Sequence, residues 1–424
     1  MIRECCDVAV LGAGFAGSLT ALLLNRIGRR VVLVDCGTHP RFAIGESSTP
    51  LADLTLRRLA EQYSLPRLLP LTRYGDWKRS HPELVCGLKR GFSYFGHRSG
   101  EEFSTDERHS RELLVAASSS DADADTHWLR ADVDAFFYQE AASDSICCLD
   151  RLALEPVSRA PWVWTGQRNG VPVEIQAEFI IDATGPAAPA ARAVGARLIT
   201  AGFETCSRSI FAHVDGLARW EQILAELGIA RGDYPFRCDA AAVHHLLDEG
   251  WMWQLPFDNG VTSVGLLLTS EQSSLPADEE WSQVVSRYPS LRRQFATSRV
   301  VAPEDGWRST GWLQRRWSVC AGEDWALLPS TAGTIDPLHS TGIAHTLSGV
   351  SRLADVLLAS SDHRERSSRL AAYSDQIVDE LCWIDMLVEG CYASLPNFRL
   401  WSAWCMLYFA AATSTEHGRG VTES

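Results

Sequence analysis

The sequence predicts an α/β protein in which a parallel sheet with helices opens the chain, further strands follow, and the last part is helical. Three observations lead to this prediction. An apolar run at residues 7–11 leads through a glycine-rich turn and a helical stretch into a second buried strand at residues 31–34. Strand-like segments recur at residues 207–214 and 262–268. From about residue 350 onward, the apolar residues keep helical spacing.

The composition is that of a large globular protein. Of the 424 residues, 46% are hydrophobic and 22% are charged, which excludes a disordered or fibrous chain. The formal net charge of −14 argues against nucleic acid as a partner, because binding to phosphate backbones needs clustered Lys and Arg. The twelve cysteines are scattered without zinc-like spacing, so we expect reduced thiols and no metal site.

No membrane segment and no leader is visible. The longest apolar run, Ala403 to Ala412, is ten residues long, whereas a membrane-spanning helix needs roughly 18 or more. The N-terminus enters an apolar strand within six residues, with neither a basic stretch nor a cleavage site. We therefore expect a cytoplasmic protein that does not have a membrane as a partner.

The glycine-rich turn carries the strongest local signal. Strand, turn (Gly12-Ala13-Gly14-Phe15-Ala16-Gly17), helix and second strand together form the βαβ fingerprint of dinucleotide-binding proteins. Gly12 permits the tight turn, Gly14 lets the backbone approach a pyrophosphate, and Gly17 lets helix and strand pack closely. The helix start around Ala16 offers N–H groups to the phosphates. Asp35 lies 18 residues after Gly17, where a carboxylate accepts hydrogen bonds from the adenosine ribose.

Five further segments resemble, in the same order along the chain, motifs of flavin-dependent halogenases and their monooxygenase relatives. The segments are Arg41–Pro50 (RFAIGESSTP), Leu129–Phe136 (LRADVDAF), Phe179–Gly185 (FIIDATG), Trp251–Pro256 (WMWQLP) and Asp336–Ile343 (DPLHSTGI). Together with the fingerprint they span residues 7–343. The chain therefore resembles the halogenase-like group within the FAD-dependent monooxygenase superfamily.

The resemblance implies a Rossmann-like FAD-binding domain of the glutathione-reductase type. The remaining FAD contacts that it implies are Arg41, Ser47, Arg130, Asp182, Gly185, Asp336, Gly342 and Ile343. At Ser340 and Thr341, N–H groups at a helix start suit an anion, which is either the halide or the anionic reduced flavin ring. The sequence departs from the family at Ser330, which replaces an aspartate that grips the ribityl chain. A neutral hydroxyl holds such a group more weakly than a carboxylate does.

The flavin motifs fall in three separated blocks, which predicts an interleaved domain organisation. The expected parts are a discontinuous FAD-binding domain of residues 1–75, 120–200 and 300–360, a sheet-containing substrate domain of residues 76–119 and 201–300, and a helical C-terminal region of residues 361–424. In the last region, a helical bundle is expected to have an apolar face that includes Trp383 and Met386.

Lys89 is the first of four residues that are expected to carry chemistry, and it lies in a strand-like stretch, residues 87–95. By resemblance, it projects into a tunnel between flavin and substrate. There, reduced flavin and oxygen form a C4a-hydroperoxide, from which halide produces hypohalous acid. An ammonium group donates to hypohalous acid, and a neutral amine, favoured if burial lowers the lysine pKa, becomes a chloramine. The alternative is a surface lysine beside Arg90.

Trp251, Trp253 and His339 are the other three. The two tryptophans share one face of a strand because they are two residues apart. By resemblance, the rings of the corresponding halogenase tryptophans screen the flavin from the organic substrate. Two ordinary core tryptophans are the alternative. His339 stands where tryptophan halogenases carry a glutamate, and it is expected to act as a base for a phenol or indole. A side chain that only packs is the alternative.

The leading functional hypothesis is reduced-FAD- and oxygen-dependent halogenation of an electron-rich aromatic substrate, with chloride or bromide as co-substrate. One alternative is an FAD-dependent monooxygenase that hydroxylates an aromatic small molecule or a peptide- or carrier-bound residue. A lesser one is a flavin-fold protein without catalysis. The sequence shows no second glycine fingerprint for NAD(P)H, so a separate flavin reductase is an expected partner.

Overall fold

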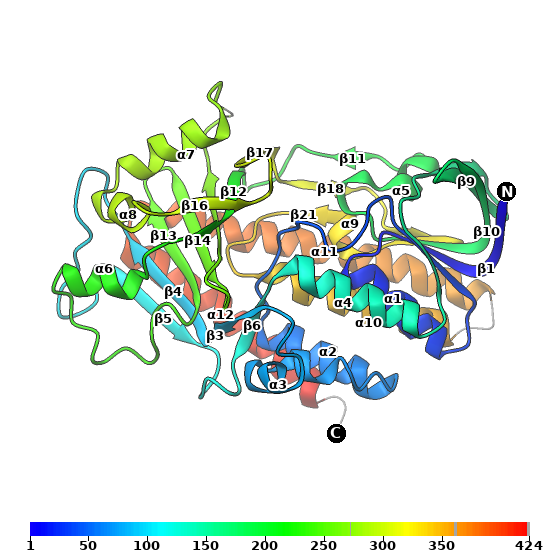
Figure 1. Ribbon diagram of the computed structural model, residues 1–424, viewed down its shortest axis with the longest axis horizontal. Coiled ribbons are helices and arrows are strands. Elements are labelled where there is room, and N and C mark those ends of the chain that lie inside the picture. Colours follow the sequence, from blue (N-terminus) through cyan, green and yellow to red (C-terminus); the bar gives the residue numbers. More distant parts are fainter. Residues whose placement is uncertain (272, 360–362, 422–424) are drawn as a thin grey trace.

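The computed structural model describes residues 1–271, 273–359 and 363–421. Two eight-stranded sheets lie at opposite ends of the molecule, and helices connect them (Figure 1). The predicted α/β fold with a helical C-terminus is confirmed. In the predicted C-terminal region, residues 361, 362 and 422–424 lie outside the described residues.

The first sheet forms the end of the molecule that carries the N-terminus (Figure 1). Its strands in spatial order are β19 (Ala321–Gly322), β20 (Trp325–Leu327), β10 (Val171–Asp182), β1 (Ile2–Leu11), β2 (Val31–Val34) and β7 (Cys147–Leu149), and β9 (Trp162–Arg168) and β8 (Leu154–Ser158) extend it from β10. The strands from β20 to β7 are parallel. All four residues of β2 are buried, as expected for a strand in a sheet covered on both faces.

Four helices pack against one another beside this sheet. They are α1 (Phe15–Arg26), α2 (Pro50–Gln62), α4 (Arg130–Ser143) and α10 (Thr341–Ala359). Helix α1 follows the glycine-rich turn directly, with Gly14 as its N-cap residue. The N-terminal ends of α1 and α10 both border the cavity described below.

The second sheet is mostly antiparallel. In spatial order its strands are β16 (Arg299–Ala302), β12 (Arg208–Asp215), β15 (Thr262–Leu268), β14 (Gly250–Pro256), β13 (Ala242–Leu247), β4 (Gly91–Gly96) and β5 (Glu112–Ala116), and β17 (Arg308–Trp312) also pairs with β12. Only the pair of β13 and β4 is parallel among these described strands. Every residue of β15 is buried, so this strand lies in the centre of a covered sheet.

Smaller elements connect the two sheets. Two short sheets consist of β3 (Cys86–Lys89) with β6 (Asp125–Trp128), and of β11 (Leu198–Ile199), β18 (Arg315–Trp317) and β21 (Gly333–Thr334). The short helices are α3 (Tyr74–Ser80), α5 (Pro189–Ala193), α6 (Trp220–Glu226), α7 (Ala277–Ser286), α8 (Pro289–Gln294) and α9 (Pro329–Ala332), with 3-10 turns at Leu69–Thr72 and Gly185–Ala187.

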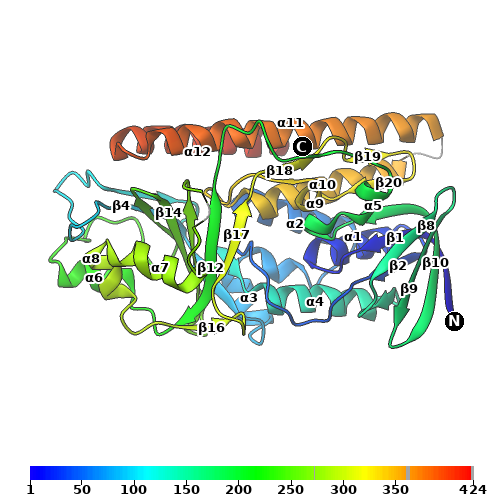
Figure 2. The ribbon, with the colours of Figure 1, turned by 90° about the horizontal axis from the view of Figure 1, so that it is seen from above.

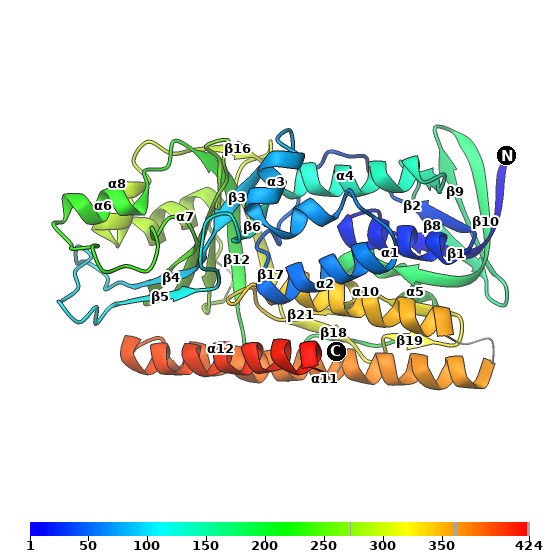
Figure 3. The same ribbon diagram turned by 90° about the horizontal axis from the view of Figure 1, so that it is seen from below.

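Two long helices end the chain. Helix α11 (His363–Ser394) runs along most of the molecule (Figure 2), and α12 (Phe398–Val421) returns beside it (Figure 3). The expected apolar face is only partly covered, because Trp383 is 62% and Met386 is 46% exposed. The two long helices contact each other, and these two side chains of the expected apolar face remain exposed. Within the described residues, the helices all fall short of the length and apolar character that crossing a membrane requires.

The predicted elements around Lys89 also need a correction. Residues 87–95 do not form one strand, because β3 ends at Lys89 in one sheet and β4 starts at Gly91 in another. At Gly91, β4 lies so close to β5 that an added Cβ would lie 2.0 Å from the Val115 carbonyl oxygen. The chain therefore changes sheets at Arg90, and Lys89 lies at this change.

Candidate functional site

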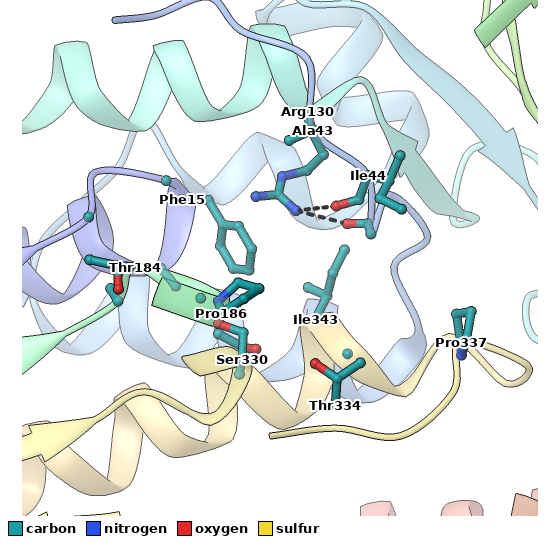
Figure 4. A pocket seen from close by; sticks show the side chains of 18 of the residues that line it. Phe15, Ala43, Ile44, Arg130, Thr184, Pro186, Ser330, Thr334, Pro337 and Ile343 are labelled. Atoms are coloured by element: carbon teal, nitrogen blue, oxygen red, sulfur yellow. Dashed lines mark hydrogen bonds between the residues drawn. The ribbon is translucent and has the colours of Figure 1, made fainter. Parts of the chain in front are cut away.

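One large cavity joins the two ends of the molecule. It has a volume of about 1270 Å³ and reaches from the glycine-rich turn and Asp35 to aromatic side chains of the second sheet. Figure 4 shows its central part, where Phe15, Pro186, Ser330 and Ile343 face one another. The volume exceeds the roughly 300–1,000 Å³ of a typical ligand pocket, which leaves room for a dinucleotide and a second molecule.

The glycine-rich turn forms one end of the cavity. Gly12 has a φ of +96°, and a Cβ there would lie 2.5 Å from the Ala183 carbonyl oxygen. A Cβ at Gly17 would lie 1.9 Å from the Gly12 carbonyl oxygen. Gly14, Ala16 and Gly17 line the cavity at the start of α1. The turn therefore leaves the helix N-terminus open to an anionic ligand.

Asp35 lies beside this turn, and both oxygens of its carboxylate already accept hydrogen bonds. It accepts hydrogen bonds from the backbone N–H groups of Ala13 at 2.7 Å and Gly37 at 2.8 Å, and Arg41 forms a two-pronged ion pair with it. Burial favours the neutral acid, but Arg41 and the two N–H groups outweigh it and lower the pKa of Asp35. Asp35 and Arg41 both line the cavity, and they are already joined to each other.

Arg130 lies across the cavity from Ser330 (Figure 4). Its guanidinium donates to the carbonyl oxygens of Ile44 at 3.0 Å and Gly45 at 3.1 Å, and it binds both oxygens of Asp134 at 2.9 Å. Asp134 also accepts from the Phe15 N–H at 3.1 Å. The sequence prediction missed Asp134, although its i, i+4 spacing from Arg130 on a helix indicates the pair.

Asp182 and Asp336 are both engaged within the protein. Asp182 accepts from the backbone N–H groups of Thr184 at 3.0 Å and Ala190 at 2.9 Å and does not line the cavity, although Gly185 does. Asp336 lines the cavity and accepts from the Leu338 N–H at 3.0 Å. Burial raises the pKa of Asp336 to about 6. Both acids shape turns at the cavity, and of the two only Asp336 is among the residues that line it.

The start of α10 supplies another part of the wall. The residues there that line the cavity are Ser340, Thr341, Gly342 and Ile343, and Ser330 lines it from α9. Ser340 has a φ of +56°, so the chain turns sharply just before the helix. Ser47 also lines the cavity, and its buried hydroxyl has no hydrogen-bond partner among the described residues. An unpartnered buried hydroxyl fits a polar ligand.

The far end of the cavity is aromatic. Its walls are formed by Phe211, His244, Trp251, Trp253 and Trp312. The Trp251 and Trp253 rings are 6.1 Å apart, and both residues are almost fully buried. Both predicted screen residues thus face the cavity. The sequence prediction missed the others, because nothing in their local sequence marks them.

Lys89 is buried but does not line the cavity. Its ammonium donates to the Ser48 carbonyl oxygen and lies 4.2 Å from the Phe92 ring centre. Since Ser47 lines the cavity, Lys89 lies directly behind this part of the wall. Burial lowers the pKa of Lys89, while the nearby carboxylates of Asp125 and Asp53 act in the opposite direction. The surface alternative is excluded, since Lys89 is 0% exposed.

His339 also lies behind the wall. Its ring stacks on Tyr408 at 4.0 Å, and its two nitrogens lie 3.4 Å from the Tyr94 hydroxyl and 3.3 Å from the Cys391 sulfur. Burial lowers the pKa of His339 to about 3, so the ring is neutral at pH 7. Neutral imidazole has the protonation state of a base.

A buried pair that the sequence prediction missed joins the two halves of the site. Glu46 lines the cavity, and its carboxylate lies 2.8 Å from the His213 ring nitrogen on β12. The residues are 167 positions apart in the sequence, so no local pattern could indicate the contact. The pair fixes the 41–50 segment against the second sheet.

The described residues fit a dinucleotide cofactor. The open helix start, the carboxylate of Asp35 and the unpartnered Ser47 hydroxyl all border one continuous space. Gly14 borders the same space, and the nearest non-neighbouring atom to an added Cβ there is an Asp134 oxygen at 3.5 Å. The backbone therefore stays accessible where a pyrophosphate would approach.

Residues 172–394 match the model of a family described as tryptophan halogenase. The chain is 28% identical to monodechloroaminopyrrolnitrin halogenase PrnC of Pseudomonas fluorescens, over 95% of this chain and 70% of that protein. It is 28% identical to tetracycline 7-halogenase of Kitasatospora aureofaciens, over 96% and 73%. The structure of halogenase PltM in complex with phloroglucinol and FAD superposes with a TM-score of 0.85 at 26% identity, over 95% of this chain and 80% of that chain.

Proposed function

The chain belongs to the tryptophan halogenase family of FAD-dependent enzymes, and we propose that it halogenates an electron-rich aromatic small molecule. The single observation that carries this proposal is the continuous cavity, which joins a dinucleotide cradle to aromatic walls at Trp251 and Trp253. The similarity to a halogenase that holds FAD and phloroglucinol supports a phenol-like substrate. The co-substrates would be oxygen and chloride or bromide.

The chain's own residues would hold FAD along the first half of the cavity. The start of α1 at Gly14 would bind the phosphates, and Asp35 would accept from the ribose once Arg41 shifts. When bound and reduced, FAD activates oxygen and so supplies the oxidising power that turns halide into hypohalous acid. Ser340 and Thr341, at the start of α10, would place the halide, since backbone N–H groups and the helix dipole favour an anion there.

Trp251 and Trp253 would keep the aromatic substrate away from the cofactor. Lys89 would receive the hypohalous acid behind the Ser47 wall, where its neutral amine forms a chloramine and releases water. The lowered pKa of Lys89 supports this role, because only the neutral amine has a free electron pair. His339 would accept the ring proton that the substrate loses on halogenation, and the burial that keeps its imidazole neutral at pH 7 also makes it a weak base for this step.

Two further parts of the proposal concern organisation. The three-block FAD domain, residues 1–75, 120–200 and 300–360, would bind the cofactor, and the two segments between these blocks would hold the substrate. A separate flavin reductase would supply reduced FAD, because the sequence lacks a second glycine fingerprint for NAD(P)H.

The test is an assay with FAD, NADH, an added flavin reductase, oxygen and sodium chloride or bromide, on matched phenols, pyrroles and indoles. Mass spectrometry should detect products with the halogen isotope pattern. Lys89→Ala should abolish halogenation while oxygen consumption continues. The chain contains only two lysines, so Lys78→Ala is a matched control. Lys78 forms an ion pair with Asp258 at 2.8 Å and lies outside the cavity wall, so this variant should halogenate normally.

Direct hydroxylation is the second candidate, and the position of Lys89 behind the cavity wall favours it. Oxygen would then enter the aromatic product without halide, and Lys89→Ala would retain that activity. A wild-type enzyme that inserts only oxygen into every aromatic offered would contradict the halogenation proposal. Tight FAD binding without any turnover would contradict both candidates.

A further inference from the structure

A chain of three hydrogen-bonded side chains connects the cavity wall to the C-terminal hairpin. The Trp251 indole N–H donates to the Tyr392 hydroxyl at 2.8 Å, and that hydroxyl donates to Asp336 Oδ2 at 2.8 Å. Trp251 and Asp336 line the cavity, whereas Tyr392 lies behind them on α11. These hydrogen bonds therefore link β14, the turn before α10, and α11.

The chemistry of the three groups fixes the direction of these bonds. An indole N–H only donates, and an ionised carboxylate only accepts. The Tyr392 hydroxyl must therefore accept from Trp251 and donate to Asp336. Ser207 donates to the same oxygen of Asp336 at 2.6 Å, since the Gln314 amide donates to the Ser207 hydroxyl at 2.9 Å. With Asp336 ionised, this network has one arrangement of protons.

The two tryptophans of the wall are held in different ways. The Trp253 ring lies on Gly265 of the neighbouring strand, where an added Cβ would be 2.1 Å from the ring, and its N–H donates to Ser263 at 3.2 Å. Trp253 is thus fixed within its own sheet. Trp251 instead has its polar bond to α11, a helix of another layer. Its orientation therefore depends on Tyr392.

We propose that Tyr392 is a positioning residue that holds the Trp251 ring in its place in the aromatic wall of the cavity. This inference rests on the proposed function for its effect on turnover. Without the hydroxyl, the buried indole N–H loses its partner, which is unfavourable in a dry site. The ring then lacks the polar contact that fixes its orientation in the aromatic wall. Oxidising equivalents escape to water before they reach the aromatic substrate.

Tyr392→Phe removes only the hydroxyl. Tyr373→Phe is the matched control, because Tyr373 lies on the same helix and also donates one buried hydrogen bond, to the Leu327 carbonyl oxygen at 2.8 Å. That bond reaches β20 and not the wall. Tyr392→Phe loses two hydrogen bonds, with Trp251 and Asp336, and Tyr373→Phe loses one, so urea unfolding of both variants measures the general loss of stability separately. Only Tyr392→Phe should affect Trp251.

The first readout needs neither cofactor nor turnover. In protein with ¹⁵N-labelled tryptophan, Trp251→Phe identifies the Trp251 indole signal. Tyr392→Phe should shift that signal and speed its hydrogen exchange at least tenfold, while Tyr373→Phe should leave it unchanged. In the wild-type chain the same N–H should exchange more slowly than that of Trp383, which is 62% exposed. If the two exchange equally fast, or if Tyr392→Phe leaves the signal unchanged, the inference is overturned.

The second readout is coupling, measured as halogenated product per oxygen consumed. Tyr392→Phe should lower it severalfold, with the FAD dissociation constant and the substrate KM within twofold of wild type. Tyr373→Phe should couple as wild type does. Equal coupling in the two variants would overturn the inference. A wild-type enzyme that forms no halogenated product would overturn the proposed function instead, and the indole readout would still test Tyr392.

Discussion

At the scale of single residues, several charged side chains that line the cavity are already paired with other side chains. Asp35, Arg130 and Glu46 line the cavity, and each already has a charged or ring-nitrogen partner. A ligand with its own charge would have to compete with these contacts, because an unpaired buried charge is costly. The aromatic end, with Phe211, Trp251 and Trp253 in its wall, favours a flat molecule that packs against rings. This agrees with the phenol-like substrate that we propose.

Lys89 gives a direct test of these electrostatics. Because the chain has two lysines, protein labelled with ¹⁵N-lysine should show two side-chain nitrogen signals. The Lys89 signal should titrate at lower pH than that of Lys78, since burial lowers the Lys89 pKa, whereas the ion pair with Asp258 raises that of Lys78. Because the unfolded chain binds this proton more tightly, the Lys89 contribution to stability should rise with pH between the lowered pKa and the ordinary one.

The Lys78→Ala spectrum assigns the two signals. Titration of both lysines at the ordinary lysine pKa would contradict the buried, desolvated state of Lys89. The Asp125 carboxylate makes the largest charge contribution that raises the Lys89 pKa. Asp125→Asn should therefore lower the Lys89 pKa further, because it removes an opposing negative charge.

Two glycines of the cavity should respond differently to one added methyl group. Gly17→Ala places a Cβ 1.9 Å from the Gly12 carbonyl oxygen, so it should lower the free energy of unfolding by about 1–3 kcal/mol, as overpacking does. Gly342→Ala meets no atom within 4 Å and should leave the stability of the free protein unchanged. It narrows the cavity, so FAD affinity should fall about tenfold, equal to ~1.4 kcal/mol.

Urea unfolding of the FAD-free protein and FAD titration by fluorescence measure these two effects separately. A destabilised Gly342→Ala protein would contradict the open space at that position. Unchanged thermal stability of the wild-type chain on adding FAD would support the non-catalytic alternative instead, because a ligand that binds the native state stabilises it.

At the scale of elements, the C-terminal hairpin depends on one close contact. An added Cβ at Gly390 of α11 would lie 1.9 Å from the Trp404 ring of α12, and the Trp404 N–H donates to the Leu387 carbonyl oxygen at 2.8 Å. Trp401 and Cys405 on α12 are buried against the second sheet. The approach of α12 to α11 therefore also sets its fit against that sheet.

Gly390→Ala should destabilise the protein by about 1–3 kcal/mol, although alanine is the better helix former. Chemical unfolding followed by circular dichroism measures the change. Gly232→Ala is the control, because a Cβ there meets nothing within 4 Å and its stability should stay within about 0.5 kcal/mol of wild type. Equal stability of the two variants would mean that α12 does not need this close contact.

Elements with a local signal could be predicted, and those that depend on distant contacts could not. The strands at residues 31–34 and 262–268 have the predicted bounds, because apolar runs between turns indicate buried strands. The break at Arg90 was missed because it arises where Gly91 meets another strand. The exposed Trp383 shows the same limit, since helical spacing alone does not reveal which face finds a partner.

In the candidate site, too, residues within short motifs could be predicted, and residues paired over long sequence distances could not. The fingerprint glycines, Asp35 and the two tryptophans lie at the cavity, and short motifs indicate each of them. Asp134 contacts Phe15 across 119 positions, and Tyr392 contacts Asp336 across 56. Only the fold brings such pairs together, so sequence reasoning could not predict them. The family resemblance spanned residues 7–343 and is confirmed by the match over residues 172–394.

At the scale of the whole molecule, the first sheet is assembled from distant parts of the chain. Strands β1 and β2 lie before residue 35, β10 ends at Asp182, and β20 ends at Leu327. Six of the eight strands of the second sheet, β12 to β17, are therefore inserted between β10 and β20, whereas β4 and β5 precede β10. Pairing over such sequence distances slows folding, because loop closure must precede the contacts.

This order has a consequence for the chain on the ribosome. Thr341 and Ile343 line the cavity, so its wall cannot be complete before residue 343 has been translated. At roughly 5–20 residues per second, the open edge of β10 waits some seconds for β20 while the inserted sheet is synthesised. During that interval apolar strands are exposed, and a chaperone has more access to the nascent chain than FAD has.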